Sequence, residues 1–243
     1  MSKIAKSYIA LVIASGMALL LLAAGSWSSA NLKQFALYLG LAALASALKV
    51  RIPGMESTIS PSFVFLLIGI VALPFSQVAV ISLAAALVQS LWASGKRPRL
   101  VQVAFSAATL VVSSALAYKF AHLVLAGSAT DSALVCVILA GSIYFPLNSA
   151  LVAIAVGLAE GRPIKQVSAH CYEWVFPYFM IGIAFAGLVS GVYTPSAIWK
   201  GALVLLPTMV LTYAYFLNCT HRALPATVLP SASEEEYPVE VHS

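Results

Sequence analysis

Long apolar runs alternate with short polar segments along almost the whole chain. The apolar core of a bilayer is about 30 Å thick, and a helix that rises about 1.5 Å per residue needs about 20 apolar residues to cross it. The pattern therefore predicts an all-α, polytopic transmembrane bundle of eight spans, at residues 8–25, 34–48, 61–73, 76–93, 100–125, 132–158, 175–193 and 198–217. The second and third spans are short, and Pro74 is predicted to end the third and start the fourth.

Lysines and arginines gather at alternate ends of these predicted helices. Cytoplasmic loops of membrane proteins carry an excess of both residues. With the amino terminus inside, ten of the thirteen cations fall in cytoplasmic segments: Lys3, Lys6, Lys49, Arg51, Lys96, Arg97, Arg99, Arg162, Lys165 and Arg222. Lys33, Lys119 and Lys200 fall at or near the outer ends. The pattern predicts a multi-pass protein of the cell inner membrane with both termini in the cytoplasm.

Composition supports a membrane location and limits the other partners. The chain is 61% hydrophobic and 9% charged, whereas soluble domains carry about a quarter charged residues. The net charge of +5 is accounted for by the basic helix ends, so nucleic acid is not indicated as a partner. Residues 1–222 are predicted to form the transmembrane domain, and residues 223–243 a short disordered acidic cytoplasmic tail.

The first apolar run has an alternative interpretation as a cleaved signal peptide. It follows a basic start and precedes the small-residue segment 24-AGSWSSA-30. The run is longer than the usual apolar core of a signal peptide, which favours a retained helix.

The segment 50-VRIPGMESTISPSF-63 is the densest polar stretch next to the apolar runs. Arg51 can hold an anionic group, together with the free N–H groups at the start of the third helix. Ser60 is predicted to be the N-cap of that helix and Pro61 its first residue. The alternative is that the segment marks a helix boundary, with Arg51 as a cytoplasmic anchor; Glu56 and Thr58 are then left unexplained.

Asn148 and Glu173 are the other candidate ligand-binding residues. Polar groups at membrane depth are costly and are often functional. Asn148 follows Pro146, where it can satisfy freed backbone groups, bond a neighbouring helix or contact a ligand. Glu173 lies close to Tyr178 and is interpreted either as an acid in the first turn of a helix, within an interfacial aromatic belt, or as a proton or cation site.

No motif in the sequence indicates an enzyme, a cofactor or a metal centre. Gly95-Lys96 lacks the glycine spacing and the following Ser or Thr of a phosphate-binding loop, and there is no HExxH motif. Two histidines and two cysteines would meet on the cytoplasmic side, but without the spacing of a zinc finger: His170, Cys171, Cys219 and His221. The protein is predicted to be non-enzymatic, with no catalytic residue, metal or cofactor.

Several segments in order resemble a known signalling module. They are 49-KVRIPGMESTISPSFVFLLIGIVALPFSQVAVISLAAALVQSLW-92, a basic loop, 144-YFPLNSALVAIAVGLAEGRP-163 and 173-EWVFPYFMIG-182. Together they resemble the membrane-embedded amino-terminal module of bacterial HD-GYP phosphodiesterases and GGDEF-type signalling proteins, over most of the chain. The resemblance implies a sensor-like module that relays a membrane or small-molecule signal. No HD or GGDEF motif follows Arg222, so either the output comes from a separate protein partner in the cytoplasm or the membrane, or there is no output.

A second resemblance implies a different function. The short helix after "IS", followed by a hairpin marked by proline, is similar to the S components of energy-coupling factor transporters. Those are small non-enzymatic proteins that bind vitamins or metals. The alternative function is therefore the substrate-binding component of a small-molecule uptake transporter. Its binding loops would lie outside the cell, whereas the charge pattern places residues 51–60 inside. A scaffold that recruits another membrane protein is the third interpretation.

Overall fold

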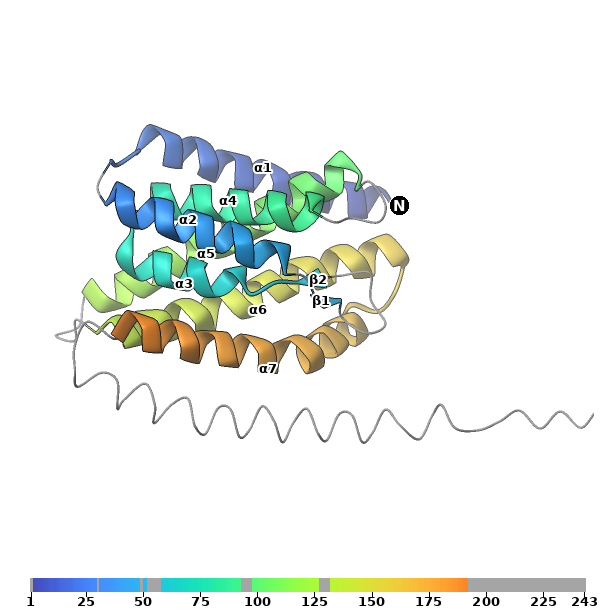
Figure 1. The fold of residues 1–243 in the computed structure, drawn as a ribbon. Coiled ribbons are helices and arrows are strands. Elements are labelled where there is room, and N and C mark those ends of the chain that lie inside the picture. The colour runs from blue at the N-terminus through green and yellow to red at the C-terminus, as the bar shows by residue number, and fades with distance from the viewer. Residues whose placement is uncertain are drawn as a thin grey trace, which may run out of the picture.

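A computed structural model describes residues 2–29, 31–48, 50–51, 58–92, 98–126 and 132–191, with the backbone alone at 50–51, 58–59, 166, 169–174 and 191. These residues form seven α-helices and one pair of two-residue strands (Figure 1). In chain order the elements are α1 (Lys3–Gly25), α2 (Leu32–Ala47), β1 (Val50–Arg51), β2 (Thr58–Ile59), α3 (Ser62–Ala72), α4 (Phe75–Leu91), α5 (Leu100–Ala126), α6 (Ala133–Glu160) and α7 (Ile164–Gly191). The predicted eighth span and the acidic tail lie outside the described residues.

Three of the helices, α1, α5 and α6, are long and apolar enough to cross a membrane. They contain 23, 27 and 28 residues. The apolar helices α2, α3 and α4 are shorter, as is the apolar part of α7. Large apolar side chains such as Leu11, Leu21 and Leu123 are more than 60% exposed on the outer faces of the bundle, as expected where lipid covers them. The chain is therefore an α-helical membrane protein.

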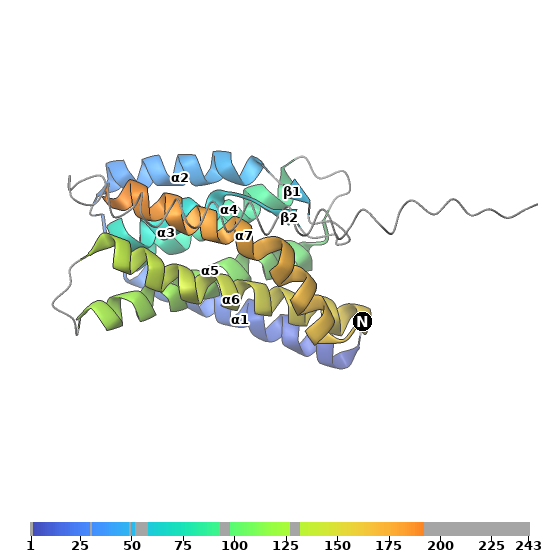
Figure 2. The same ribbon diagram turned by 90° about the horizontal axis from the view of Figure 1, so that it is seen from below.

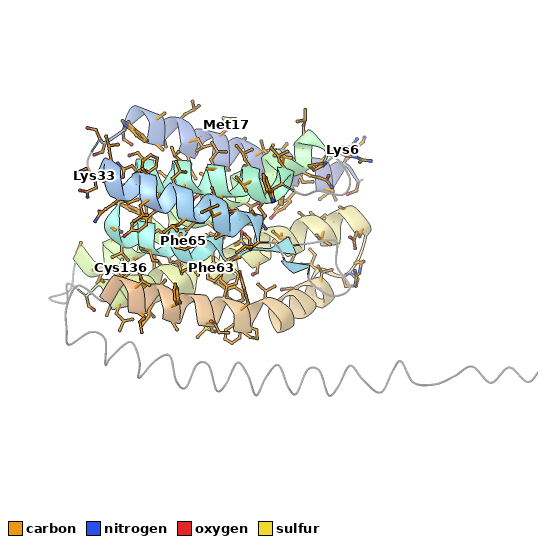
Figure 3. The ribbon with its side chains drawn as sticks, viewed as in Figure 1. Lys6, Met17, Lys33, Phe63, Phe65 and Cys136 are labelled. Atoms are coloured by element: carbon orange, nitrogen blue, oxygen red, sulfur yellow. The ribbon has the colours of Figure 1, made fainter. Side chains whose placement is uncertain are left out.

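Successive helices run in opposite directions, so alternate connections gather at the same end of the bundle (Figure 1). Lys6, in the first turns of α1, and Lys33, at the start of α2, mark the two opposite ends (Figure 3). The end that holds the first turn of α1 also holds the start of α5 and the α6–α7 connection. We call it the basic end, because it carries Lys3, Lys6, Arg99, Arg162 and Lys165. For these seven helices the arrangement agrees with the alternation predicted from the charges.

Small residues bring the helices together. A Cβ atom added to Gly16 of α1 would lie 2.6 Å from the Cα of Ala108 on α5, so the two backbones are almost in contact. A Cβ added to Gly141 of α6 would lie 2.6 Å from Ile183 of α7. Close packing of this kind is the main source of helix association in a bilayer, where lipid tails are as apolar as leucine.

The short helix α3 lies at the centre of the bundle. It contacts α2, α4, α5, α6 and α7, and eight of its eleven residues are buried. It ends at Ala72, and the extended backbone of Leu73 and Pro74 turns the chain into α4, which confirms the predicted helix break. The predicted N-cap is wrong by one residue, because α3 begins at Ser62 with Pro61 at the cap and no side-chain capping bond.

The seventh helix begins much earlier than predicted. α6 ends at Glu160 and is followed by Gly161, whose positive φ of 69° favours glycine, and α7 starts at Ile164 after Pro163. Glu173 is thus the tenth residue of α7, so its interpretation as an acid in the first turn of a helix is wrong. The apolar run marks only part of a helix that starts at the short turn after α6.

Candidate functional site

The start of α3 lies level with the middle of α6 and α7. The ring of Phe63, the second residue of α3, stacks on Phe179 of α7 with centroids 4.2 Å apart and lies 5.3 Å from the ring of Tyr178. Phe179 also packs against Tyr144 and Phe145 of α6, at 6.0 and 4.8 Å. These residues are near the midpoints of two 28-residue helices. The chain that leads into α3 therefore reaches about half the depth of the bundle.

The backbone that leads into α3 is not helical. The strands β1 and β2 pair in antiparallel register, with Val50 opposite Ile59 and Arg51 opposite Thr58. Both views place this pair between the end of α2 and the start of α3, toward the basic end (Figures 1 and 2). Non-helical backbone at membrane depth is tolerated only where protein buries it or where it lines a water-filled space. This segment is therefore the candidate site, and it brings together the backbones of two predicted ligand-binding residues.

A hydrogen-bonded cluster connects the start of α3 to α4. The hydroxyl of Ser60, which is 6% exposed, donates to Gln89 Oε1 at 3.1 Å and accepts from the hydroxyl of Ser62 at 2.9 Å. Ser62 is 2% exposed. The predicted site residue Ser60 is thus an interior group at the entrance to α3. Gln89 was not among the predicted ligand-binding residues, although a glutamine within an apolar run is a signal of a polar contact in the bundle.

Two prolines weaken α6 and α7 at the same depth. The Phe145–Phe179 ring pair and the close approach of Gly141 to Ile183 set the antiparallel register of the two helices. In this register Pro146 of α6 lies level with Pro177 of α7. Each proline lacks an N–H, so the carbonyl group four residues earlier loses its helical partner. Backbone acceptors are consequently available on both helices close to the start of α3.

Two buried polar atoms at this level have no hydrogen-bond partner within the described residues. They are Asn148 Oδ1 and the hydroxyl oxygen of Tyr178. Asn148 follows Tyr144 by one helical turn and so shares the face of α6 that packs on Phe179. Buried polar atoms are normally paired with protein or water, which makes these two atoms candidates for contact with a ligand or with water. Among the described helices none donates a hydrogen bond to Asn148 Oδ1.

The remaining predicted site residues are only partly placed. Glu173 lies in α7, one turn before Pro177. In the register of α6 and α7 it is about one turn of α6 away from the level of Asn148. Its side chain is outside the description, as are those of Arg51 and Thr58, and Glu56 lies outside the described residues. Tyr178 was interpreted as part of an interfacial belt; its hydroxyl is instead buried beside Phe63.

Other buried polar groups tie helices together away from the site. Ser82 of α4 donates to Ser114 of α5 at 2.9 Å. Gln77 Nε2 donates to the carbonyl oxygen of Ser28 at 2.9 Å, which fixes the start of α4 to the α1–α2 connection. In the part of the chain that the structure describes, no group of three or more His, Cys, Asp or Glu side chains is placed to hold a metal ion.

The fold and this site define an α-helical membrane protein with a polar segment inserted to mid-depth. No family model matches the chain, and neither a curated protein nor a solved structure matches it. The two resemblances drawn from the sequence therefore stay hypotheses, and the function is argued from the site.

Proposed function

We propose that the protein is a non-enzymatic, eight-span inner-membrane protein that binds a small anionic ligand at the start of α3. In this proposal it is a sensor-like module that relays ligand binding to a separate protein partner. The observation that supports it most is the non-helical polar segment that enters the bundle to mid-depth, because such a segment in a membrane protein usually serves a binding site.

The chemistry of the segment favours an anion. The first N–H groups of a helix lack intrahelical partners, and the helix dipole gives this end a partial positive charge. Arg51 lies in the strand pair just before α3, and the basic end of the bundle adds further cations. A guanidinium and helix N–H groups together suit a carboxylate or phosphate group. The hydroxyls of Ser60 and Ser62 lie at the same entrance, where they hydrogen-bond to Gln89 and to each other.

The contacts of α3 offer a route from the ligand to the basic end. Phe63 packs on Phe179 and Tyr178, directly after Pro177 of α7. A ligand that shifts the start of α3 would change this contact where the backbone of α7 has lost a hydrogen bond. The first half of α7, which starts at the basic end, would then move relative to the second half. The proposed partner would detect that movement.

A thermal-shift screen tests ligand binding. We expect at least one small carboxylate or phosphate ester, at millimolar concentration, to raise the melting temperature of the purified protein. Single substitutions Arg51→Ala and Asn148→Ala should each remove that rise, since each takes away a hydrogen-bond donor of the proposed site, whereas Glu173→Ala removes a negative charge and should not weaken anion binding. Lys33→Ala, at the opposite end of the bundle, should keep it. Unchanged stabilisation in both the Arg51→Ala and the Asn148→Ala protein would refute the site.

Labelling with an impermeant thiol reagent tests the transporter alternative. Ser57→Cys is introduced after replacement of the native Cys136, Cys171 and Cys219. With both termini inside, we expect no labelling in intact cells and full labelling in inverted membrane vesicles. Labelling in intact cells would place the segment outside, as the uptake-component function requires, and would contradict the proposed orientation.

A further inference from the structure

A shallow groove on the outer face of α4 is separate from the site at α3. It has a volume of about 250 Å³ and is lined by Leu87, Val88, Leu91 and Trp92. Three of these side chains are strongly exposed: Leu87 is 37%, Leu91 59% and Trp92 62% exposed. The groove lies in the last two turns of α4, toward the basic end.

The groove lies deeper in the bundle than the cation at the start of α5. The Ser82–Ser114 hydrogen bond and the Phe75–Tyr118 ring pair set the antiparallel register of α4 and α5. In this register the end of α4 is level with the second turn of α5. The exposed Arg99 immediately precedes α5, so it lies one to two turns, about 5–10 Å, beyond the groove.

The stretch of sequence that contains this groove carries charge of one sign. The sequence has no acidic residue between Glu56 and Asp131. Within that stretch Lys96, Arg97 and Arg99 follow Trp92 closely; the first two lie outside the described residues and contribute here only by their charge. An apolar surface with a tryptophan at its edge and Arg99 about 5–10 Å further out matches the layering of a phospholipid, with acyl chains below a charged headgroup.

From this arrangement we propose that the α4 groove is a binding site for one anionic phospholipid. An acyl chain lies along Leu87 and Leu91, and the phosphate headgroup is held at Arg99. Zwitterionic phospholipids share the acyl chains but lack the net negative charge, so the site selects for the headgroup. The proposal is independent of a ligand at the start of α3.

Fluorescence quenching of Trp92 in reconstituted full-length protein tests the site. Trp27→Phe, Trp174→Phe and Trp199→Phe leave Trp92 as the sole tryptophan of the four. Vesicles contain brominated phosphatidylglycerol or brominated phosphatidylcholine, and the ratio of their quenching gives relative binding beside Trp92. We expect phosphatidylglycerol to bind at least about fivefold more strongly at low salt, since one cation near a membrane surface contributes about that factor.

Two charge variants distinguish lipid binding at Arg99 from a general attraction of anionic lipid to the positively charged protein. Arg99→Gln should lower the binding ratio about fivefold, and its backbone bond to Gln102 does not involve the replaced side chain. Lys33→Gln, which removes one exposed cation at the opposite end, should leave the ratio unchanged. Equal quenching by the two lipids would overturn the proposal, as would a ratio that is the same in the Arg99→Gln protein. If neither lipid quenched Trp92, protein would cover the groove, and this result would also overturn the proposal.

Discussion

Replacement of Gly16 by alanine is expected to lower the free energy of unfolding by about 1–3 kcal/mol. The measurement is a denaturing-detergent titration of the protein in mixed micelles. The added methyl group would lie 2.6 Å from both the Cα and the Cβ of Ala108. Neither atom can move by a side-chain rotation, so α1 has to separate from α5. The close contact of these helices, which in a bilayer supplies much of the packing energy, would be lost over several turns.

Gly40 provides the matched control. It lies within the apolar helix α2, and a Cβ added there meets nothing within 4 Å. Gly40→Ala should leave the unfolding free energy unchanged or raise it by up to about 1 kcal/mol, because alanine favours the helix more than glycine does. If Gly16→Ala and Gly40→Ala proved equally stable, the close approach of α1 to α5 would be wrong.

Phe63→Ala is expected to cost about 3 kcal/mol of unfolding free energy in the same assay, at the low end of the range for buried phenylalanines in soluble proteins. The ring is 3% exposed and packs on Phe179 and against Gly182. Its removal leaves a cavity that the bundle encloses, so lipid cannot fill it. The low end applies because transfer of the ring into lipid costs little, and only the packing and cavity contributions remain.

Phe185 on the same helix as Phe179 is the control for this substitution. It is 48% exposed on the outer face of α7. Lipid can replace the contacts of its ring, so Phe185→Ala should change the unfolding free energy by less than about 1 kcal/mol. A Phe63→Ala protein as stable as Phe185→Ala would mean that α3 does not begin against the middle of α7.

The apolar pattern predicts the bounds of most helices well because a proline or a charged residue interrupts many of the apolar runs. The starts and ends of α3, α4 and α5 differ from the prediction by no more than two residues, since Pro61, Pro74 and Arg99 interrupt the runs there. The start of α7 was missed by eleven residues. Its first turns are polar but helical, and the length of an apolar run does not show how far a helix continues beyond that run.

The candidate site was only partly predictable for a related reason. Ser60 was found because polar residues are dense around it. Gln89 and Tyr178 take part because α3 starts beside α4 and beside the middle of α7. That placement depends on the register of helices that are far apart in the sequence, and no local pattern contains it. The same register places Pro146 and Pro177 at the same depth. The sequence shows each proline, but it does not show that the two lie level with each other.

The central position of α3 also constrains the order of assembly during synthesis. An 11-residue helix is about 16 Å long and too short to cross a bilayer, so it depends on neighbouring helices for burial. The helices α2 and α4 are made next to it, but Phe63 meets Phe179 only about 116 residues later. At about 5–20 residues per second the ribosome needs roughly 6–23 s to make that stretch. During this interval one side of α3 has no protein neighbour, and the polar segment before it acquires its final surroundings only when α7 has been inserted.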